Sequence, residues 1–200
     1  MDIRFIAIER EYGSAGTAIG QETARRCGIR CYGREIMEMV AREQQISVEA
    51  LEAYEETVSG SLLYSLFVMS QSQTGDPDLV SGESKLYVAE TRQIRQLIRS
   101  GPAIFVGHCA VKALEGKSGV LRVFIHGSEE DKHRRICRDY GIPKAEVAAA
   151  CRRINKRRSN YYNFCMKKRW DDYQNYDLVL DSSALGIEGC VRVLSSLLQK

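Results

Sequence analysis

A glycine-rich turn near the start of the chain is the first feature suited to chemistry. It consists of Gly13-Ser14-Ala15-Gly16 and follows an apolar stretch that ends at Ile8. Glycines that lead into a helix let a phosphate approach the backbone, where the first N–H groups of the helix are unpaired and the helix dipole is positive. The spacing alone fits phosphate binding and a merely tight strand-to-helix turn equally well. The residues expected to contact the ligand are Tyr12, Gly13, Ser14, Ala15, Gly16 and Thr17.

This turn departs from the phosphate-binding motif GxxxxGK[ST], because no lysine follows its glycines. The hydroxyls of Ser14 and Thr17 could contact a phosphate or a metal-bound water, with capping of the helix as the competing role. Glu9 and Glu11 could help to hold Mg²⁺ or pair with an arginine, and surface charge beside a turn explains them as well. We therefore assign no metal ligand from the sequence.

A cationic segment lies much later in the chain. Residues 151–169 include eight Lys or Arg and no Asp or Glu. Arg152, Arg153, Arg157 and Arg158 lie there at helical spacings, and a guanidinium binds phosphate oxygens in a planar, bidentate manner. A solvated helix face explains any one of these arginines equally well.

A pair of arginines, Arg92 and Arg95, lies one helical turn apart ahead of a predicted strand. Residues at this spacing share part of a helix surface. One of them, for which we choose Arg92, could point toward a bound acceptor phosphate while the other faces solvent.

The elements that must position these residues alternate between strands and helices. Apolar runs rich in β-branched residues predict strands, and apolar residues at helical intervals that end at glycine or proline predict helices. The predicted strands are residues 3–8, 103–106, 121–125 and 176–180. The predicted helices are residues 17–27, 32–44, 47–53, 84–100, 128–140 and 187–198, with a further apolar helix and loop within 59–82.

This alternation predicts an α/β protein with a parallel sheet covered by helices on both faces, in which ligands sit beyond the carboxyl ends of the strands. The glycine-rich turn lies at such an end. A length of 200 residues favours one domain over the whole chain, 1–200, with a small mobile part.

The composition argues against several classes of protein. With 44% hydrophobic and 28% charged residues, the chain is typical of a folded globule rather than a disordered protein. A net charge of +3 is too small for bulk attraction to nucleic acid or to a membrane. There is no signal-peptide pattern or run of transmembrane length, and the seven cysteines are scattered as in reduced proteins. We expect a cytoplasmic protein without membrane contact.

Several ordered segments together carry more information than the turn alone. They are Ile8-Glu9-Arg10-Glu11-Tyr12-Gly13-Ser14-Ala15-Gly16, Val106-Gly107-His108-Cys109-Ala110, Arg122-Val123-Phe124-Ile125-His126, Asn155-Lys156-Arg157-Arg158-Ser159-Asn160-Tyr161-Tyr162, and Asn175-Tyr176-Asp177-Leu178-Val179-Leu180 with Leu185-Gly186-Ile187. In this order the chain resembles the cytidylate kinase-like family of bacterial proteins over nearly its whole length.

The resemblance implies a P-loop fold like that of the nucleoside monophosphate kinases. It implies transfer of the γ-phosphoryl group of ATP, with Mg²⁺, to a nucleotide such as CMP or to another small phosphate acceptor. An arginine-rich helical lid, here approximately residues 141–172, would close over the reaction. Because such transfer depends on neutralising negative charge, Arg158, Arg157 and Arg153 are the predicted catalytic residues, with Arg158 on the motif itself.

The chain departs from the family pattern at two positions where relatives have a cationic side chain. Relatives commonly carry Gly-Ser-Gly-Gly-Arg in the turn, whereas here Ala15 replaces a glycine and Thr17 stands where the arginine would be. Relatives commonly carry Val-Gly-Arg after the middle strand, in a place resembling an acceptor-phosphate contact, and this chain has His108, which the resemblance implies as a substrate-binding residue. Losing such a guanidinium can cost roughly 10³-fold in rate. Asn155 also replaces the usual Asp of the lid segment.

Two other functions therefore stay open. The chain could be a non-catalytic nucleotide sensor that has lost the transfer residues. The basic and aromatic segment 152–169 could instead bind single-stranded nucleic acid, which we rank last because the rest of the chain is not basic. The predicted partner is a nucleotide substrate, and a homodimer is left open.

Overall fold

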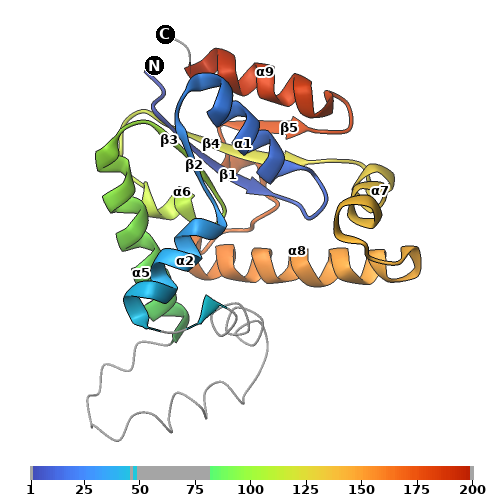
Figure 1. The fold of residues 1–200 in the computed structure, drawn as a ribbon, viewed down its shortest axis with the longest axis horizontal. Helices are drawn as coiled ribbons and strands as arrows, with labels where there is room; N and C mark the ends of the chain where they lie inside the picture. The colour runs from blue at the N-terminus through green and yellow to red at the C-terminus, as the bar shows by residue number, and fades with distance from the viewer. Residues whose placement is uncertain (1, 46, 49–81, 199–200) are drawn as a thin grey trace, which may run out of the picture.

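A five-stranded, all-parallel sheet forms the centre of the molecule, with the strand order β2-β3-β1-β4-β5 (Figure 1). The structure is a computed structural model and describes residues 2–45, 47–48 and 82–198. The strands are β1 Phe5–Arg10, β2 Arg30–Tyr32, β3 Ala103–Val106, β4 Val120–His126 and β5 Leu178–Asp181. The predicted parallel sheet is confirmed.

Helices connect these strands, as the alternation predicted. They are α1 Gly16–Cys27, α2 Arg34–Gln44, α5 Gly82–Leu97, α6 Ala110–Ala113, α7 Glu129–Tyr140, α8 Lys144–Met166 and α9 Gly186–Leu198, with short 3-10 turns at Ile98–Ser100 and Tyr173–Asn175. The predicted helices at 47–53 and within 59–82 lie almost entirely outside the described residues. Within the described part, no helix is long and apolar enough to cross a membrane.

Strand β1 shows how the two faces of the sheet are covered. Its side chains alternate between the faces, as in any strand. Phe5 and Ala7 pack in a core cluster with residues of α5, α6 and α8, whereas Ile6 and Ile8 pack in a second cluster with residues of α1 and α9. Figure 1 shows α1 and α9 on one side of the sheet and α5 and α8 on the other. The predicted three-layer arrangement is therefore present.

The register of β1 and β3 positions the site. Ile8 pairs with Val106, so the turns that follow these two strands leave the sheet side by side at its carboxyl edge. The Gly107 N–H donates to the Ile8 carbonyl (2.9 Å), which fixes the start of the second turn against the first. Helix α8 runs past the same edge, beside the loop that joins β1 to α1 (Figure 1). Three segments distant in sequence therefore meet at this place.

Candidate phosphate-binding site

The loop between β1 and α1 presents backbone donors. The residue that caps α1 is Ala15, which has a left-handed backbone (φ 61°) and no side-chain capping bond. Within the described part of the chain, the N–H groups of Gly13, Ala15, Gly16 and Thr17 meet no acceptor. Unpaired N–H groups at a helix N-terminus form a favourable place for an anion. The turn therefore has the donors that phosphate binding requires.

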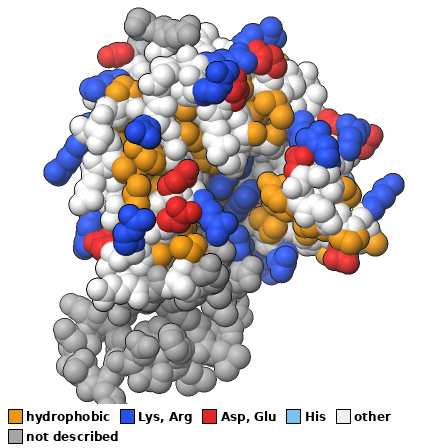
Figure 2. All heavy atoms as spheres, in the orientation of Figure 1, with side chains coloured by type: hydrophobic (Ala, Val, Ile, Leu, Met, Phe, Trp, Pro, Cys, Tyr) orange, Lys and Arg blue, Asp and Glu red, His pale blue; other side chains and the backbone are white. Residues whose placement is uncertain are grey.

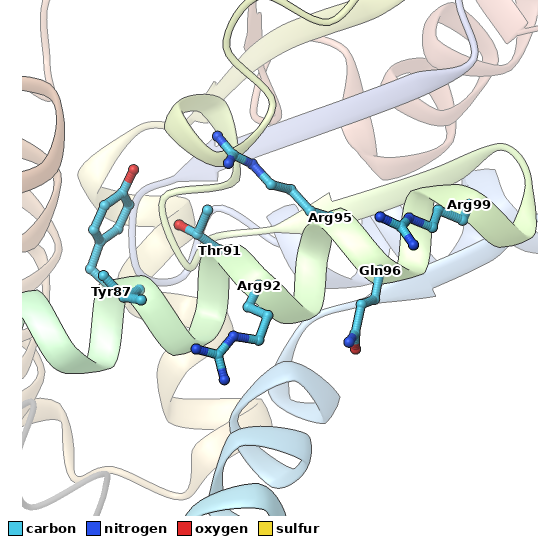
Figure 3. A pocket seen from close by; sticks show the side chains of 7 residues that line it. Tyr87, Thr91, Arg92, Arg95, Gln96 and Arg99 are labelled. Atoms are coloured by element: carbon cyan, nitrogen blue, oxygen red, sulfur yellow. The ribbon is translucent and has the colours of Figure 1, made fainter.

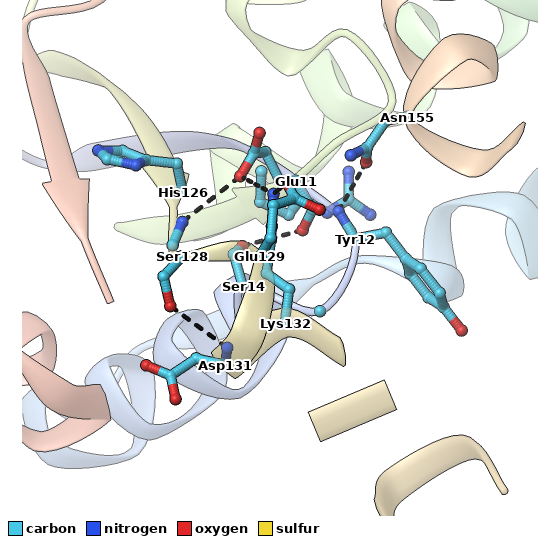
Figure 4. A network of polar contacts seen from close by, with 12 residues as sticks. Glu11, Tyr12, Ser14, His126, Ser128, Glu129, Asp131, Lys132 and Asn155 are labelled. Carbon is cyan, nitrogen blue, oxygen red and sulfur yellow. Dashed lines mark hydrogen bonds and ion pairs between the residues drawn. The ribbon is translucent and has the colours of Figure 1, made fainter. Parts of the chain in front are cut away.

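Internal hydrogen bonds and a contact with α7 brace this loop (Figure 4). The Ser14 hydroxyl and backbone N–H both donate to the Glu11 carbonyl, at 2.9 and 3.3 Å. The Glu11 carboxylate accepts from Lys132 Nζ at 2.9 Å and from the Gly127 N–H at 3.4 Å. Ser14 therefore stiffens the loop instead of capping α1, and Glu11 pairs with a lysine of α7 instead of an arginine of α8.

The glycines of the turn allow this close packing. A Cβ at Gly13 would lie 2.8 Å from the Lys132 carbonyl oxygen, and Gly13 has φ 79°. A Cβ at Gly16 would lie 2.6 Å from Arg10 Cβ. Real Cβ atoms do not approach other atoms so closely, so a side chain at either position would displace the loop.

Helix α8 contacts the loop through two hydrogen bonds. The Tyr12 N–H donates to Asn155 Oδ1 at 2.7 Å, and Arg158 Nη1 donates to the Arg10 carbonyl at 3.0 Å. The Arg158 guanidinium also lies 5.8 Å from the centre of the Tyr12 ring, within the range of a cation–π contact. The segment that carries the predicted catalytic arginines therefore lies against the glycine-rich turn.

The electrostatics beside the loop favour an anion. Burial, and then the charge of Arg10, lowers the pKa of Arg158 to about 9, so its guanidinium is still cationic at neutral pH. Glu9 precedes Arg10 in β1 and is buried; burial raises the pKa of Glu9, although Arg10 and a hydrogen bond from Trp170 Nε1 (3.2 Å) oppose this. Two half-buried arginines therefore lie beside unpaired N–H groups.

The other two predicted arginines lie near Arg158. Burial raises the pKa of Tyr12, and the positive charges of Arg158 and Arg153 act against this, so Arg153 is close enough to influence the loop. The charge of Arg157 similarly contributes to the lowered pKa of Arg158. Figure 2 shows Lys and Arg side chains inside a recess that separates the region of α7 from the rest of the molecule. Closure of residues 141–172 as a lid stays a prediction.

The two predicted acceptor contacts differ in their placement. Arg92 is exposed and pairs with Glu43 of α2 (2.8 Å), beside a surface groove of about 530 Å³ along α5 (Figure 3). This structure does not bring Arg92 to the glycine-rich turn. His108 follows β3 at the carboxyl edge, and its Nδ1 lies 2.7 Å from Glu90 Oε1. His108 therefore lies at the same edge as the candidate phosphate-binding turn, where it contacts the carboxylate of Glu90.

Sequence reasoning missed several polar residues of this region, including Glu90. It lies inside a predicted helix, 18 residues before His108, so no short motif links the two. Lys132 and Trp170 are also buried at the site, through contacts with Glu11 and Glu9. Only the way in which α5, α7 and the segment after α8 fold back on the sheet brings these residues together.

Among the described residues, no group of three or more His, Cys, Asp or Glu side chains could hold a metal ion. Magnesium in phosphoryl-transfer sites often needs only one or two protein ligands, with substrate phosphates supplying others. Thr17 is exposed in the first turn of α1, with its hydroxyl available for such a role.

Comparisons with solved structures show the same fold. An uncharacterized protein from Eubacterium ventriosum ATCC 27560 aligns with a TM-score of 0.71 at 19% identity, over 97% of both chains. A shikimate kinase from Bacteroides thetaiotaomicron aligns with 0.55 at 13%, over 97% of both chains. A gluconokinase from Sinorhizobium meliloti 1021 aligns with 0.53 at 15%, over 98% of this chain and 92% of that one. At these identities the similarity shows the fold, which is that of P-loop kinases.

The family follows from the sequence itself. No curated protein matches the chain. A model of the cytidylate kinase-like family matches residues 5–184, which include the glycine-rich turn, His108 and the arginines of α8. The chain therefore belongs to the cytidylate kinase-like family.

Proposed function

We propose that the protein is an ATP-dependent phosphotransferase that holds the phosphates of ATP at the turn from Gly13 to Thr17. One observation carries this proposal. Unpaired N–H groups of the turn lie beside the cationic Arg158, which is hydrogen-bonded to the base of the same loop. Preorganised donors of this kind stabilise the negative charge of a transferring phosphoryl group. Family membership agrees with this chemistry.

Each residue would have a defined part in the transfer. The N–H groups of Gly13, Ala15, Gly16 and Thr17 would bind phosphate oxygens, and Arg158 would offset charge on the transferring group, with Arg153 and Arg157 contributing from the same helix. Mg²⁺, when bound with ATP, would neutralise phosphate charge further. The acceptor would lie beyond the ends of β1 and β3, where His108 is placed. A nucleotide such as CMP is the acceptor implied by the family.

A non-catalytic nucleotide sensor is the second candidate, because one specific feature favours it. Thr17 is exposed at the position where relatives have a cationic side chain, so this turn supplies no cation of its own after the glycines. Arg10 and Arg158 lie beside the loop and could compensate. Whether transfer occurs decides between the two functions.

Turnover and binding together test the proposal. The full-length protein is incubated with ATP, Mg²⁺ and a panel of nucleoside monophosphates that includes CMP, and ADP is measured; calorimetry with a non-hydrolysable ATP analogue is run in parallel. The proposal predicts binding and ADP formation. Binding without turnover on any acceptor selects the sensor, and failure to bind the analogue excludes both. A cytoplasmic location, a homodimer and the lack of nucleic-acid binding stay predictions.

A further inference from the structure

The side chain of Tyr12 is buried, although the residue lies in the loop that forms the candidate phosphate-binding site. Tyr12 is 8% exposed and directly precedes Gly13. It packs in a core cluster with apolar side chains of α7 and α8, which are Ile136, Val147, Ala150 and Cys151. Tyr12 therefore joins the glycine-rich turn to the helix that carries the predicted catalytic arginines.

Two residues of α8, three positions apart, contact Tyr12. Asn155 Oδ1 accepts from the Tyr12 N–H at 2.7 Å, and Cζ of Arg158 lies 5.8 Å from the centre of the Tyr12 ring. Residues at this spacing share a helix face, so α8 contacts the backbone and the side chain of Tyr12 together. The ring of Tyr140, at the end of α7, also packs on Tyr12, with 5.1 Å between the ring centres. Both helices therefore hold the Tyr12 ring.

The Tyr12 ring restricts the guanidinium of Arg158. Nη1 of Arg158 donates to the Arg10 carbonyl at 3.0 Å, and this bond alone would leave the guanidinium plane free to turn. Burial, and then the charge of Arg10, lowers the pKa of Arg158, so the two cations repel each other. The negative face of an aromatic ring attracts a cation and offsets part of such repulsion. The ring therefore supplies the second contact that determines where the guanidinium lies.

A role in placing Arg158 differs from an ordinary place in the core. A core side chain stabilises the fold, and its loss does not change the chemistry of the molecules that stay folded. A group that acts on a transferring phosphoryl can lose roughly 10²-fold in rate when it is misplaced by about 1 Å. A ring that places Arg158 is therefore detected in turnover, and only while Arg158 is present.

Resting on the proposed function, we propose that Tyr12 is a positioning residue for phosphoryl transfer, whose ring holds the Arg158 guanidinium beside the glycine-rich turn. The ring face carries this role and the hydroxyl does not, because the cation–π contact is made with the ring. Two contacts on one guanidinium also reduce the side-chain freedom that phosphate binding would otherwise have to remove.

A double-mutant cycle in the full-length protein tests the inference. ADP formation is measured at saturating ATP, Mg²⁺ and acceptor for the parent, Tyr12→Leu, Arg158→Met and the double variant. The acceptor is the nucleoside monophosphate of the panel that reacts fastest. If none reacts, the dissociation constant of the non-hydrolysable ATP analogue replaces kcat as the quantity that the cycle compares.

Three further variants make the cycle decisive. Tyr12→Phe keeps the ring and removes the hydroxyl. Tyr12→Met has a longer side chain without a ring and takes the place of Tyr12→Leu if that variant does not fold. Tyr173→Leu is the matched control, because Tyr173 is 70% exposed in the 3-10 turn that follows α8. Urea unfolding establishes that each variant is folded under the assay conditions.

We expect Tyr12→Leu to lower kcat about 10- to 100-fold, and Tyr12→Phe to restore the activity to within about threefold of the parent. In the Arg158→Met background, Tyr12→Leu should cost less than about threefold, because the group that the ring positions is then absent. When binding is compared, Tyr12→Leu should weaken the analogue about three- to tenfold, again only while Arg158 is present. Tyr173→Leu should match the parent.

Three results would overturn the inference and leave the proposed function standing. A folded Tyr12→Leu with the kcat of the parent, or with its dissociation constant where binding is compared, would assign the ring to the core alone. Equal losses from Tyr12→Leu with and without Arg158 would show that the ring does not act through Arg158. A folded Tyr12→Phe that loses more than about tenfold would assign the role to the hydroxyl. Failure of the parent to bind the analogue overturns the proposed function, and the inference with it.

Discussion

Replacement of Arg158 by methionine removes one charge from the phosphate site while keeping a long side chain. The variant loses the hydrogen bond to the Arg10 carbonyl (3.0 Å), and a bond with a charged donor is worth about 1.5–3 kcal/mol. Removing a half-buried cation beside Arg10 also relieves the desolvation and the repulsion that lower the pKa of Arg158, which offsets part of this loss. We therefore expect the free energy of unfolding to fall by less than about 2 kcal/mol.

The effect on turnover should be much larger. Loss of a guanidinium that neutralises a transferring phosphoryl group costs roughly 10³-fold in kcat, which is about 4 kcal/mol of transition-state stabilisation. ADP release is measured at saturating ATP, and urea unfolding is measured for the same preparations. Arg152→Met, at an exposed position of the same helix, is the matched control and should change neither quantity by much.

The reasoning fails if Arg158→Met, folded by the urea criterion, turns over ATP within about threefold of the parent. It fails equally if Arg152→Met loses as much activity as Arg158→Met, because the effect would then follow the overall charge of α8. A loss of analogue affinity without a change in kcat would place Arg158 in ground-state binding only.

Three further predictions concern the loop. Asn155→Ala should lower the unfolding free energy by about 1–3 kcal/mol, because it orphans the half-buried Tyr12 N–H, whereas Asn155→Asp should retain stability; urea unfolding distinguishes them. Gly16→Ala should lower the unfolding free energy by about 1–3 kcal/mol and weaken analogue binding, because the added Cβ would lie 2.6 Å from Arg10 Cβ; urea unfolding and calorimetry check both effects. Glu9→Gln should stabilise the protein at neutral pH. The pKa of Glu9 is raised in the folded state, so above about pH 4.5 the folded state binds more protons than the unfolded state, and the protein's stability falls as pH rises. The advantage of Gln should therefore vanish below about pH 4.5, where the carboxyl is protonated in both states. An advantage that persists at pH 3 would contradict the last argument.

The sequence was most informative where local patterns determine structure. The apolar run before the glycine-rich turn predicted β1, and helix 128–140 was predicted with nearly correct ends, because Ser128 accepts from the Asp131 N–H and Gly141 ends α7 with φ 66°. Strand β2 was missed because Arg30–Tyr32 is too short to show a period and pairs only with β3 among the described strands. Its pairing partner lies some 70 residues away in sequence, so no local pattern reveals it.

The site was predicted in part for the same reason. Arg158 could be chosen from its motif and charge, but its hydrogen bond to the Arg10 carbonyl depends on the placement of α8 across the sheet edge. Helical spacing could not decide how Arg92 is oriented, and packing of α5 against α2 pairs it with Glu43. His108 was predicted as an acceptor contact only because it stands where relatives have an arginine. Its contact with Glu90 required the three-dimensional structure.

Titration of the ¹⁵N-labelled protein with a non-hydrolysable ATP analogue and Mg²⁺, followed by amide chemical shifts, tests the phosphate site most directly. The unpaired N–H groups of the turn predict saturable downfield shifts of the Gly13, Ala15, Gly16 and Thr17 amides, with smaller shifts for Gly28 at the far end of α1. Saturable binding that leaves these four amides unshifted would contradict the account.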